Sequence, residues 1–193
     1  MSTSESKWVH SLIPRLTNAL KKHHASGLEI GVSDARKLPY TCEIHGYSDD
    51  GSSTKNISSY QTDLLFFDIP RSDRWIPRVV VECKLGRIST HDALTYSAKA
   101  ATHKHVHPYL RYGILAGERE HYAIPVRLVK HGTYFDFMAT WRAARPTAGE
   151  WRDFCALVVD EVKASRAMQE LLTTNRSAKR RKYHTLHRPL LLR

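Results

Sequence analysis

Two apolar segments of the chain, residues 61–69 and 78–85, carry ionisable side chains where buried strands would carry none. Asp63 lies near the start of the first segment, and Glu82 and Lys84 follow three valines in the second. Residues two apart on a strand point to the same face, so Glu82 and Lys84 would lie side by side. Charges among apolar residues cost free energy unless they are paired or bound to a metal. The pattern therefore indicates a functional site.

These residue types suit metal-assisted hydrolysis of a phosphodiester bond. Two carboxylates from adjacent strands, Asp63 and Glu82, can hold Mg²⁺ together with water and a backbone carbonyl, here that of Cys83. The Cys83 side chain would point into the opposite, apolar layer. A lysine beside the metal, Lys84, can orient the attacking water or stabilise charge on the phosphate. We therefore expect Asp63, Glu82 and Lys84 to be the catalytic residues.

Two other interpretations apply to the same segments. Asp68 competes with Asp63, but Ile69-Pro70 would place Asp68 at the end of its strand, facing a turn. We therefore favour Asp63. The structural alternative is a Glu82–Lys84 pair at the surface of an edge strand, with Asp63 merely starting a strand.

The elements that must position these residues follow from hydrophobic patterning. Apolar residues spaced three and four apart predict a helix over 8–24, with Pro14 either in a first turn capped by Ser11 or at a kink. Near-continuous apolar runs predict central strands at 61–69 and 78–85. The other predicted elements are a strand at 37–47, a polar hairpin loop at 48–59, a helix at 90–105, strands at 111–116, 122–129 and 135–138, and a long helix at 149–172. This order predicts a single α/β domain, residues 1–175, with a central mixed sheet flanked by helices.

The spacing of the charged residues resembles the PD-(D/E)xK nuclease superfamily, and within it the restriction-endonuclease-like proteins. The resemblance rests on Asp63, eighteen intervening residues and Glu82-Cys83-Lys84, and it covers about residues 8–116. Thr62 stands where the name of the motif has proline. The resemblance implies an αβββαβ core in which the two acidic residues bind Mg²⁺ and the lysine assists attack by water on a DNA phosphate.

The function implied is a Mg²⁺-dependent DNA endonuclease of the type II restriction kind, acting in bacterial defence. The alternatives are a junction-resolving, repair or transposon-end nuclease of the same fold, or a non-catalytic nucleic-acid-binding module. Such nucleases usually act as homodimers, and the helix at 149–172 offers a dimer surface. Many add a glutamate from near the first helix. Because the predicted helix 8–24 contains no acid, Glu29 and Glu43 are the candidates.

Additional DNA contacts are expected on the helix after the E-x-K strand, which flanks the active site in this fold. The candidates there are Lys99, near Tyr96, and the following Lys104 and Arg111, with a solvated helix face as the alternative. Three histidines, His103, His105 and His107, invite a zinc interpretation. We do not favour zinc, because only the first and last share a helical face and no cysteine is nearby.

Composition favours a polyanionic partner, most commonly nucleic acid. Thirty Lys and Arg against nineteen Asp and Glu give a formal charge of +11. The tail, residues 176–193, holds seven basic and no acidic residues, and it could bind DNA or only aid solubility. The tail residues expected to contact DNA are Lys179, Arg180, Arg181 and Lys182.

Other sequence features concern location. No apolar run approaches the roughly 20 residues of a membrane-spanning helix, and no apolar stretch precedes Trp8 to form a signal peptide. Three widely separated cysteines do not form a disulfide framework. We therefore expect a reduced, cytoplasmic protein that does not enter membranes.

Overall fold

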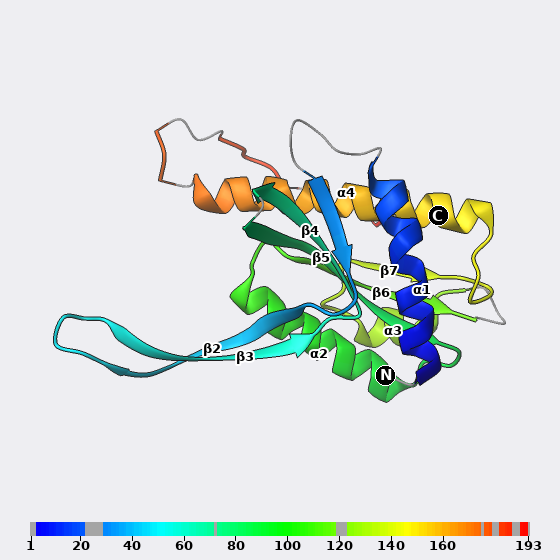
Figure 1. Cartoon of the computed structure of the whole chain (residues 1–193), viewed down its shortest axis with the longest axis horizontal. Helices are drawn as coiled ribbons and strands as arrows, with labels where there is room; N and C mark the ends of the chain where they lie inside the picture. The colour runs from blue at the N-terminus through cyan, green and yellow to red at the C-terminus, as the bar shows by residue number, and fades with distance from the viewer. Residues whose placement is uncertain are drawn as a thin grey trace.

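Five strands form the central sheet of the computed structural model, in the order β1-β4-β5-β6-β7 (Figure 1). The structure describes residues 3–21, 29–71, 73–118, 123–174, 176–178, 182–186 and 190–192. The strands are β1 (Glu29–Ser33), β4 (Leu64–Arg71), β5 (Arg74–Leu85), β6 (Arg111–Gly117) and β7 (Phe137–Thr140). Neighbours β1, β4 and β5 run antiparallel, whereas β5, β6 and β7 run parallel. The predicted mixed sheet is confirmed.

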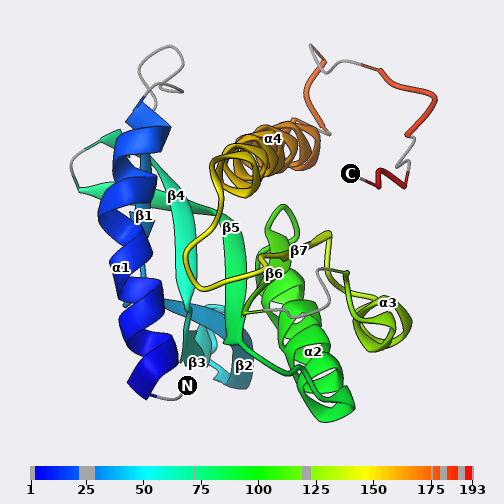
Figure 2. The same ribbon diagram turned by 90° about the vertical axis from the view of Figure 1, so that its right-hand side faces the viewer.

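Helices cover both faces of this sheet (Figure 2). One face packs against α1 (Thr3–Leu20) and α4 (Ala148–Thr173), and the other against α2 (Thr90–Val106) and the short α3 (Val126–His131). Successive residues alternate between the two layers: Val79 and Val81 lie in the α1–α4 core, and Val80 lies in the α2 core. Two-sided cover explains why β4 and β5 are near-continuous apolar runs.

The first helix differs from its prediction at its start. It begins at Thr3, five residues before the predicted start, and Pro14 lies in its interior. Ser11 does not cap it; its hydroxyl donates to the Trp8 carbonyl at 2.6 Å. The helices α2 and α4 begin close to the predicted positions, each at a reciprocal capping box, Ser89 with Asp92 and Thr147 with Glu150.

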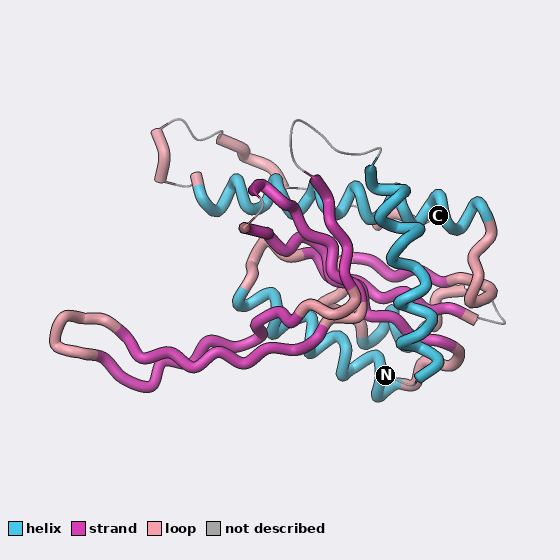
Figure 3. The backbone as a smooth tube through the Cα atoms, in the orientation of Figure 1, coloured by secondary structure: helices cyan, strands magenta, loops and turns pink. Residues whose placement is uncertain are grey.

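A two-stranded hairpin projects from the body of the protein (Figures 1 and 3). It consists of β2 (Lys37–Tyr47) and β3 (Ser53–Gln61), which pair with each other and form a sheet separate from the central one. We call residues 37–61 the arm. The strand at 37–47 is confirmed, but 48–59 is not a loop, since only residues 48–52 form the turn and β3 follows. β3 is mostly exposed on both faces and so lacks the apolar alternation of a core strand.

The structure decides two further predictions and adds one strand that was not predicted. The predicted strand at 122–129 is wrong, because Val126–His131 is helix α3. β7 confirms that the segment near 135–138 extends the sheet. β1 was not predicted; it is only five residues long, and its Gly31 lies under the Phe67 ring, where a Cβ would come within 2.5 Å of a ring carbon.

The described parts of the tail, residues 176–178, 182–186 and 190–192, contain neither helix nor strand. Lys182 is exposed, while Lys179, Arg180 and Arg181 lie outside the described residues. Within the described ranges, the longest helices are too polar to cross a membrane.

Candidate functional site

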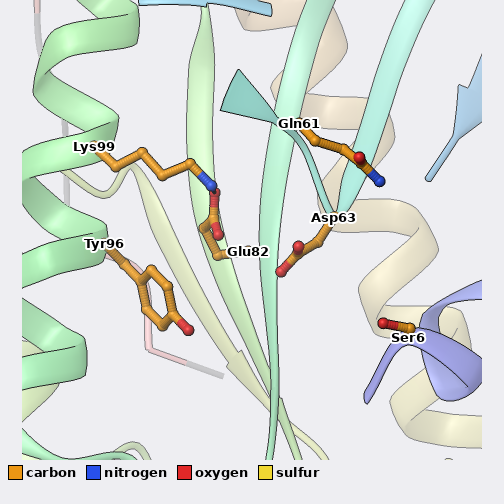
Figure 4. A pocket seen from close by; sticks show the side chains of 6 residues that line it. All are labelled: Ser6, Gln61, Asp63, Glu82, Tyr96 and Lys99. Carbon is orange, nitrogen blue, oxygen red and sulfur yellow. Dashed lines mark ion pairs between the residues drawn. The ribbon is translucent and has the colours of Figure 1, made fainter. Parts of the chain in front are cut away.

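Two carboxylates from adjacent strands meet at a cavity of about 340 Å³ (Figure 4). In the antiparallel pairing of β4 and β5, Leu64 lies opposite Val81, which brings Asp63 opposite Glu82. The residues lining the cavity are Ser6, Gln61, Asp63, Glu82, Tyr96 and Lys99. They come from α1, the end of the arm, the residue before β4, the C-terminal part of β5 and α2. The structure therefore brings together the two acids predicted from the sequence.

Glu82 is a buried charge with two hydrogen-bond donors. It is 1% exposed, because β5 is a central strand covered by α2. Lys99 reaches down from α2 and places its Nζ 2.8 Å from Oε1 of Glu82 (Figure 4). The Tyr112 hydroxyl, on neighbouring β6, donates to the same oxygen. Lys99 thus supplies the positive charge that a buried carboxylate needs.

Asp63 lacks such compensation. The backbone N–H of Cys83 donates to its Oδ2 at 2.8 Å. Burial, and next the negative charge of Glu82, raise the pKa of Asp63 to about 7, against the opposing effects of the Cys83 N–H and Lys99. A carboxyl group whose pKa is raised by a neighbouring carboxylate lies where the surrounding positive charge is insufficient. A cation bound between Asp63 and Glu82 would remove that shortage.

Lys84 forms a second acid–lysine pair beside the cavity. Its Nζ lies 3.4 Å from Oε2 of Glu5, a residue of the first turn of α1 that is 5% exposed. Lys84 does not line the cavity, whereas Lys99 does. Glu5 was not predicted, because the helix was expected to begin at Trp8. Helical spacing could have identified it, since Glu5 lies four residues before Val9 and continues the buried stripe of α1.

The two glutamates considered from the sequence lie elsewhere. Glu29 is exposed and pairs with Ile69, at the end of β4 far from Asp63. Glu43 is exposed on the arm, where Asn56 donates to its Oε2 at 3.2 Å. Neither reaches the cavity, and Glu5 is the acid that the first helix contributes.

Asp68 does not face a turn, contrary to the sequence-based expectation. It lies within β4, is fully buried, and accepts from Arg78 Nε at 2.7 Å. Arg166 of α4 completes the cluster through Nε at 3.0 Å and Nη2 at 2.5 Å. With two guanidinium groups on one carboxylate, Asp68 joins α4 to the sheet and has no place in the cavity.

Of the basic residues expected to contact DNA that the structure describes, only Lys99 lines the cavity. Lys104 contacts Asp136 at 2.8 Å, and Arg111 bridges Asp136 at 2.8 Å and Glu161 at 2.5 Å. These pairs tie α2, β6 and α4 to the segment before β7. The structure therefore explains Lys104 and Arg111 as ion-pair partners that hold these elements together.

His103 serves packing. It is fully buried between the base of the arm and the sheet, and its Nδ1 lies 3.0 Å from the Pro39 carbonyl oxygen. Since a carbonyl only accepts, Nδ1 carries the proton. Burial lowers the pKa of His103 to about 4, so the ring is neutral at pH 7. It stacks on Tyr112 at 5.7 Å, which links the arm to the residue that bonds Glu82.

The donor set at the cavity suits a hard cation with few protein ligands. Among the residues the structure describes, no three His, Cys, Asp or Glu side chains come close enough together to hold a metal. Mg²⁺ keeps several waters and commonly takes only one or two carboxylates. Asp63 and Glu82 fit that requirement. The hydrogen bonds described above involve Oδ2 of Asp63 and Oε1 of Glu82, so they do not use the other oxygen of either carboxylate. The Cys83 side chain packs in the opposite apolar layer, as predicted.

No protein-family model matches this chain, and no curated protein matches it. The function is therefore inferred from the residues of the site itself.

Proposed function

We propose that the protein is a Mg²⁺-dependent nuclease that hydrolyses phosphodiester bonds in DNA, with a site of the PD-(D/E)xK type. The observation that carries the proposal is the pair Asp63 and Glu82, opposed on adjacent strands at a cavity, with the pKa of Asp63 raised. A carboxylate pair of this kind at a cavity, with Glu82 buried and Asp63 partly buried, is a functional-site candidate. The net charge of +11 suits a polyanionic substrate.

The order of elements supports the same proposal. The series α1, β1, β4, β5, α2 and β6 has the αβββαβ arrangement implied by the resemblance, with the arm inserted between β1 and β4. Asp63 precedes the second core strand and Glu82 lies on the third. We propose a restriction-like endonuclease, with a junction-resolving, repair or transposon-end nuclease as the alternative within the fold.

In this proposal Asp63 and Glu82 hold Mg²⁺, which would supply Lewis-acid stabilisation of phosphate charge and an activated water. Lys99 and Lys84 hold positive charge on two sides of Glu82, one from α2 and one two residues along β5. Tyr96 lines the cavity with its hydroxyl, and burial followed by the charges of Glu82 and Asp63 raises its pKa, so it stays a neutral donor. Lys84, Lys99 and Tyr96 can orient a phosphate without serving as ligands of the metal.

Lys84 and Lys99 make separable contributions. Lys84→Ala should lower the cleavage rate at saturating DNA about a hundredfold, in the usual range for one positioned catalytic group, while binding in Ca²⁺ persists. Lys99→Ala should also weaken folding, because it removes the charge partner of buried Glu82. Single-turnover cleavage and thermal melts measure the two effects. Equal losses of rate and DNA affinity in Lys84→Ala would make that lysine an ordinary phosphate contact.

Cleavage of supercoiled plasmid and of a four-way junction, with Mg²⁺ or EDTA, tests the proposal. The wild type should cut at least one of these substrates only with Mg²⁺, and Glu82→Gln should not cut. The matched control is Asp160→Asn, which removes an exposed carboxylate of α4. Preference for plasmid or junction decides between the restriction-like and resolving alternatives. Cutting by Glu82→Gln at the wild-type rate would reject the site.

A further inference from the structure

The arm carries an apolar face that is left exposed by the parts of the chain that the structure describes. Cys42 lies opposite Ile57 in the β2–β3 pairing, and Ile44 lies opposite Lys55. Tyr47, opposite Ser53, falls on the same face. Ile44 is 53% exposed, Ile57 58% and Tyr47 74%. We call Cys42, Ile44, Tyr47 and Ile57 the arm stripe. The other face is polar, with Asn56 bonded to Glu43.

A hairpin of this kind needs support. A lone two-stranded ribbon is marginally stable in water, and three strands or a packed partner are normally required. Eleven residues of β2 span about 35 Å at the rise of an extended strand. The base of the arm packs on the body through α2 and His103. The outer part projects beyond the body in Figures 1 and 3. The stripe on it is therefore suited to a contact with another molecule.

The charge of the arm opposes that of the rest of the protein. Residues 37–61 hold Lys37 and Lys55 against Glu43, Asp49 and Asp50, a formal charge of −1 on a chain of +11. The two aspartates sit at the tip, where the Ser52 N–H donates to Asp50 Oδ1 at 2.8 Å. This balance disfavours a nucleic acid backbone as the occupant. It favours a basic protein surface, and the body of this chain is one.

A complementary surface lies on α3. Val126 and Val129 are 66% and 64% exposed, and Lys130 is exposed beside them at helical spacing. Leu128 is fully buried and anchors the helix to the body. Residues 123–135 contain Arg127 and Lys130 but no acid. This α3 face, defined as Val126, Val129 and Lys130, pairs apolar side chains with positive charge, as the stripe pairs apolar side chains with an acidic tip.

We propose that the arm of one copy docks on the α3 face of a second copy, so that two chains form a reciprocal dimer with two equivalent contacts. In such a dimer each contact pairs the arm stripe with Val126 and Val129, and the Asp49–Asp50 tip with Lys130. A closed two-fold arrangement satisfies both arms at once. This dimer uses a different surface from the long helix expected from the sequence, and it does not depend on nuclease activity.

Analytical ultracentrifugation of the full chain, over a range of concentrations, tests the proposal. The wild type should dimerise, and Ile57→Asp and Val129→Asp should each raise the dissociation constant at least tenfold. Mixing these two variants should give heterodimers that are tighter than the dimers of either variant but weaker than the wild type, because one of their two contacts pairs an intact arm with an intact α3 face. Thr54→Asp, on the polar face of the arm, is the matched control and should stay within about twofold of wild type.

A charge exchange guards against variants that only misfold. Asp49→Lys should weaken the dimer, and Lys130→Glu in the same chain should recover it. A wild type that is monomeric at every concentration, or a mixture that dimerises no more tightly than the two variants do alone, would overturn the proposal. So would an Ile57→Asp variant that loses DNA affinity but keeps its oligomeric state, because the arm would then be a nucleic-acid contact.

Discussion

Asp63 immediately precedes β4 and Asp68 lies within it, five residues further on, yet their surroundings are opposite. Asp68 is fully buried and contacts two guanidinium groups, those of Arg78 and Arg166. Asp63 meets a second carboxylate, Glu82, across the strand pair and opens on a cavity. A buried carboxylate that is paired with cationic side chains holds elements together, whereas a carboxylate beside a second carboxylate favours binding of a cation. Under the proposed function, the partners of each aspartate distinguish the structural role of Asp68 from the metal-binding role of Asp63.

The largest contrast is expected in catalysis. Asp63→Asn should reduce Mg²⁺-dependent cleavage at least a thousandfold, because it removes one of two carboxylate ligands from a site with few protein ligands. Asp68→Asn should cut at a rate within about tenfold of wild type per folded molecule. Single-turnover assays, normalised by the folded fraction from circular dichroism, measure both. If the two variants lose activity equally, the contrast between the aspartates fails.

The next contrast is in the stability of the fold, where the larger effect is expected at Asp68 rather than at Asp63. Asp68→Asn should destabilise the protein by about 3–5 kcal/mol, because it leaves the guanidinium of Arg78, which is 4% exposed, without its counter-charge. Asp63→Asn should not destabilise the metal-free protein at neutral pH. Urea unfolding in EDTA compares the two, with Asp160→Asn as the exposed control. Wild-type stability in Asp68→Asn would show that the guanidinium cluster does not hold α4 to the sheet.

A smaller effect is expected in the pH dependence of stability. The folded pKa of Asp63, about 7, exceeds the unfolded value of about 3.9, so the folded state binds the extra proton between these values. The stabilisation from that proton is complete below about pH 4 and is lost as pH rises through 7. In EDTA the wild type should therefore lose on the order of 2–4 kcal/mol relative to Asp63→Asn across this window. Parallel stability curves for wild type and Asp63→Asn would contradict the raised pKa.

The sequence predicted the parts of this fold that have strong local patterns. The apolar runs of β4 and β5 were recognisable because most of their described side chains are buried, and α4 was recognisable because its buried residues recur at helical spacing. β3 was not recognised because Ser53–Gln61 is exposed on both faces, so no alternation distinguishes it from a loop. The segment at 122–129 was predicted as a strand, but Leu128 is the one buried residue among its described residues 123–129, and Val126–His131 forms α3.

The site was predictable in its acids and less so in its partners. Asp63 and Glu82 stood out as charges inside apolar strands. Glu5 was hidden because the helix start was set at the first apolar residue, although helical spacing extends the stripe back to it. The contact of Lys99 with Glu82, and the two arginines on Asp68, depend on how α2 and α4 pack over the sheet. Such tertiary contacts leave no periodic signal in the sequence.

Calorimetric titration of the protein with Mg²⁺ tests the central claim most directly, since it measures the demand for a cation at Asp63 and Glu82 without relying on cleavage. At pH 7, titrations in buffers of different ionisation enthalpy should show release of roughly half a proton per bound ion, because an Asp63 carboxyl with a pKa of about 7 is half protonated there. Asp63→Asn should bind more weakly and release no proton, while Asp160→Asn should match the wild type. Equal Mg²⁺ affinity and proton release in the wild type and in Asp63→Asn would contradict the account.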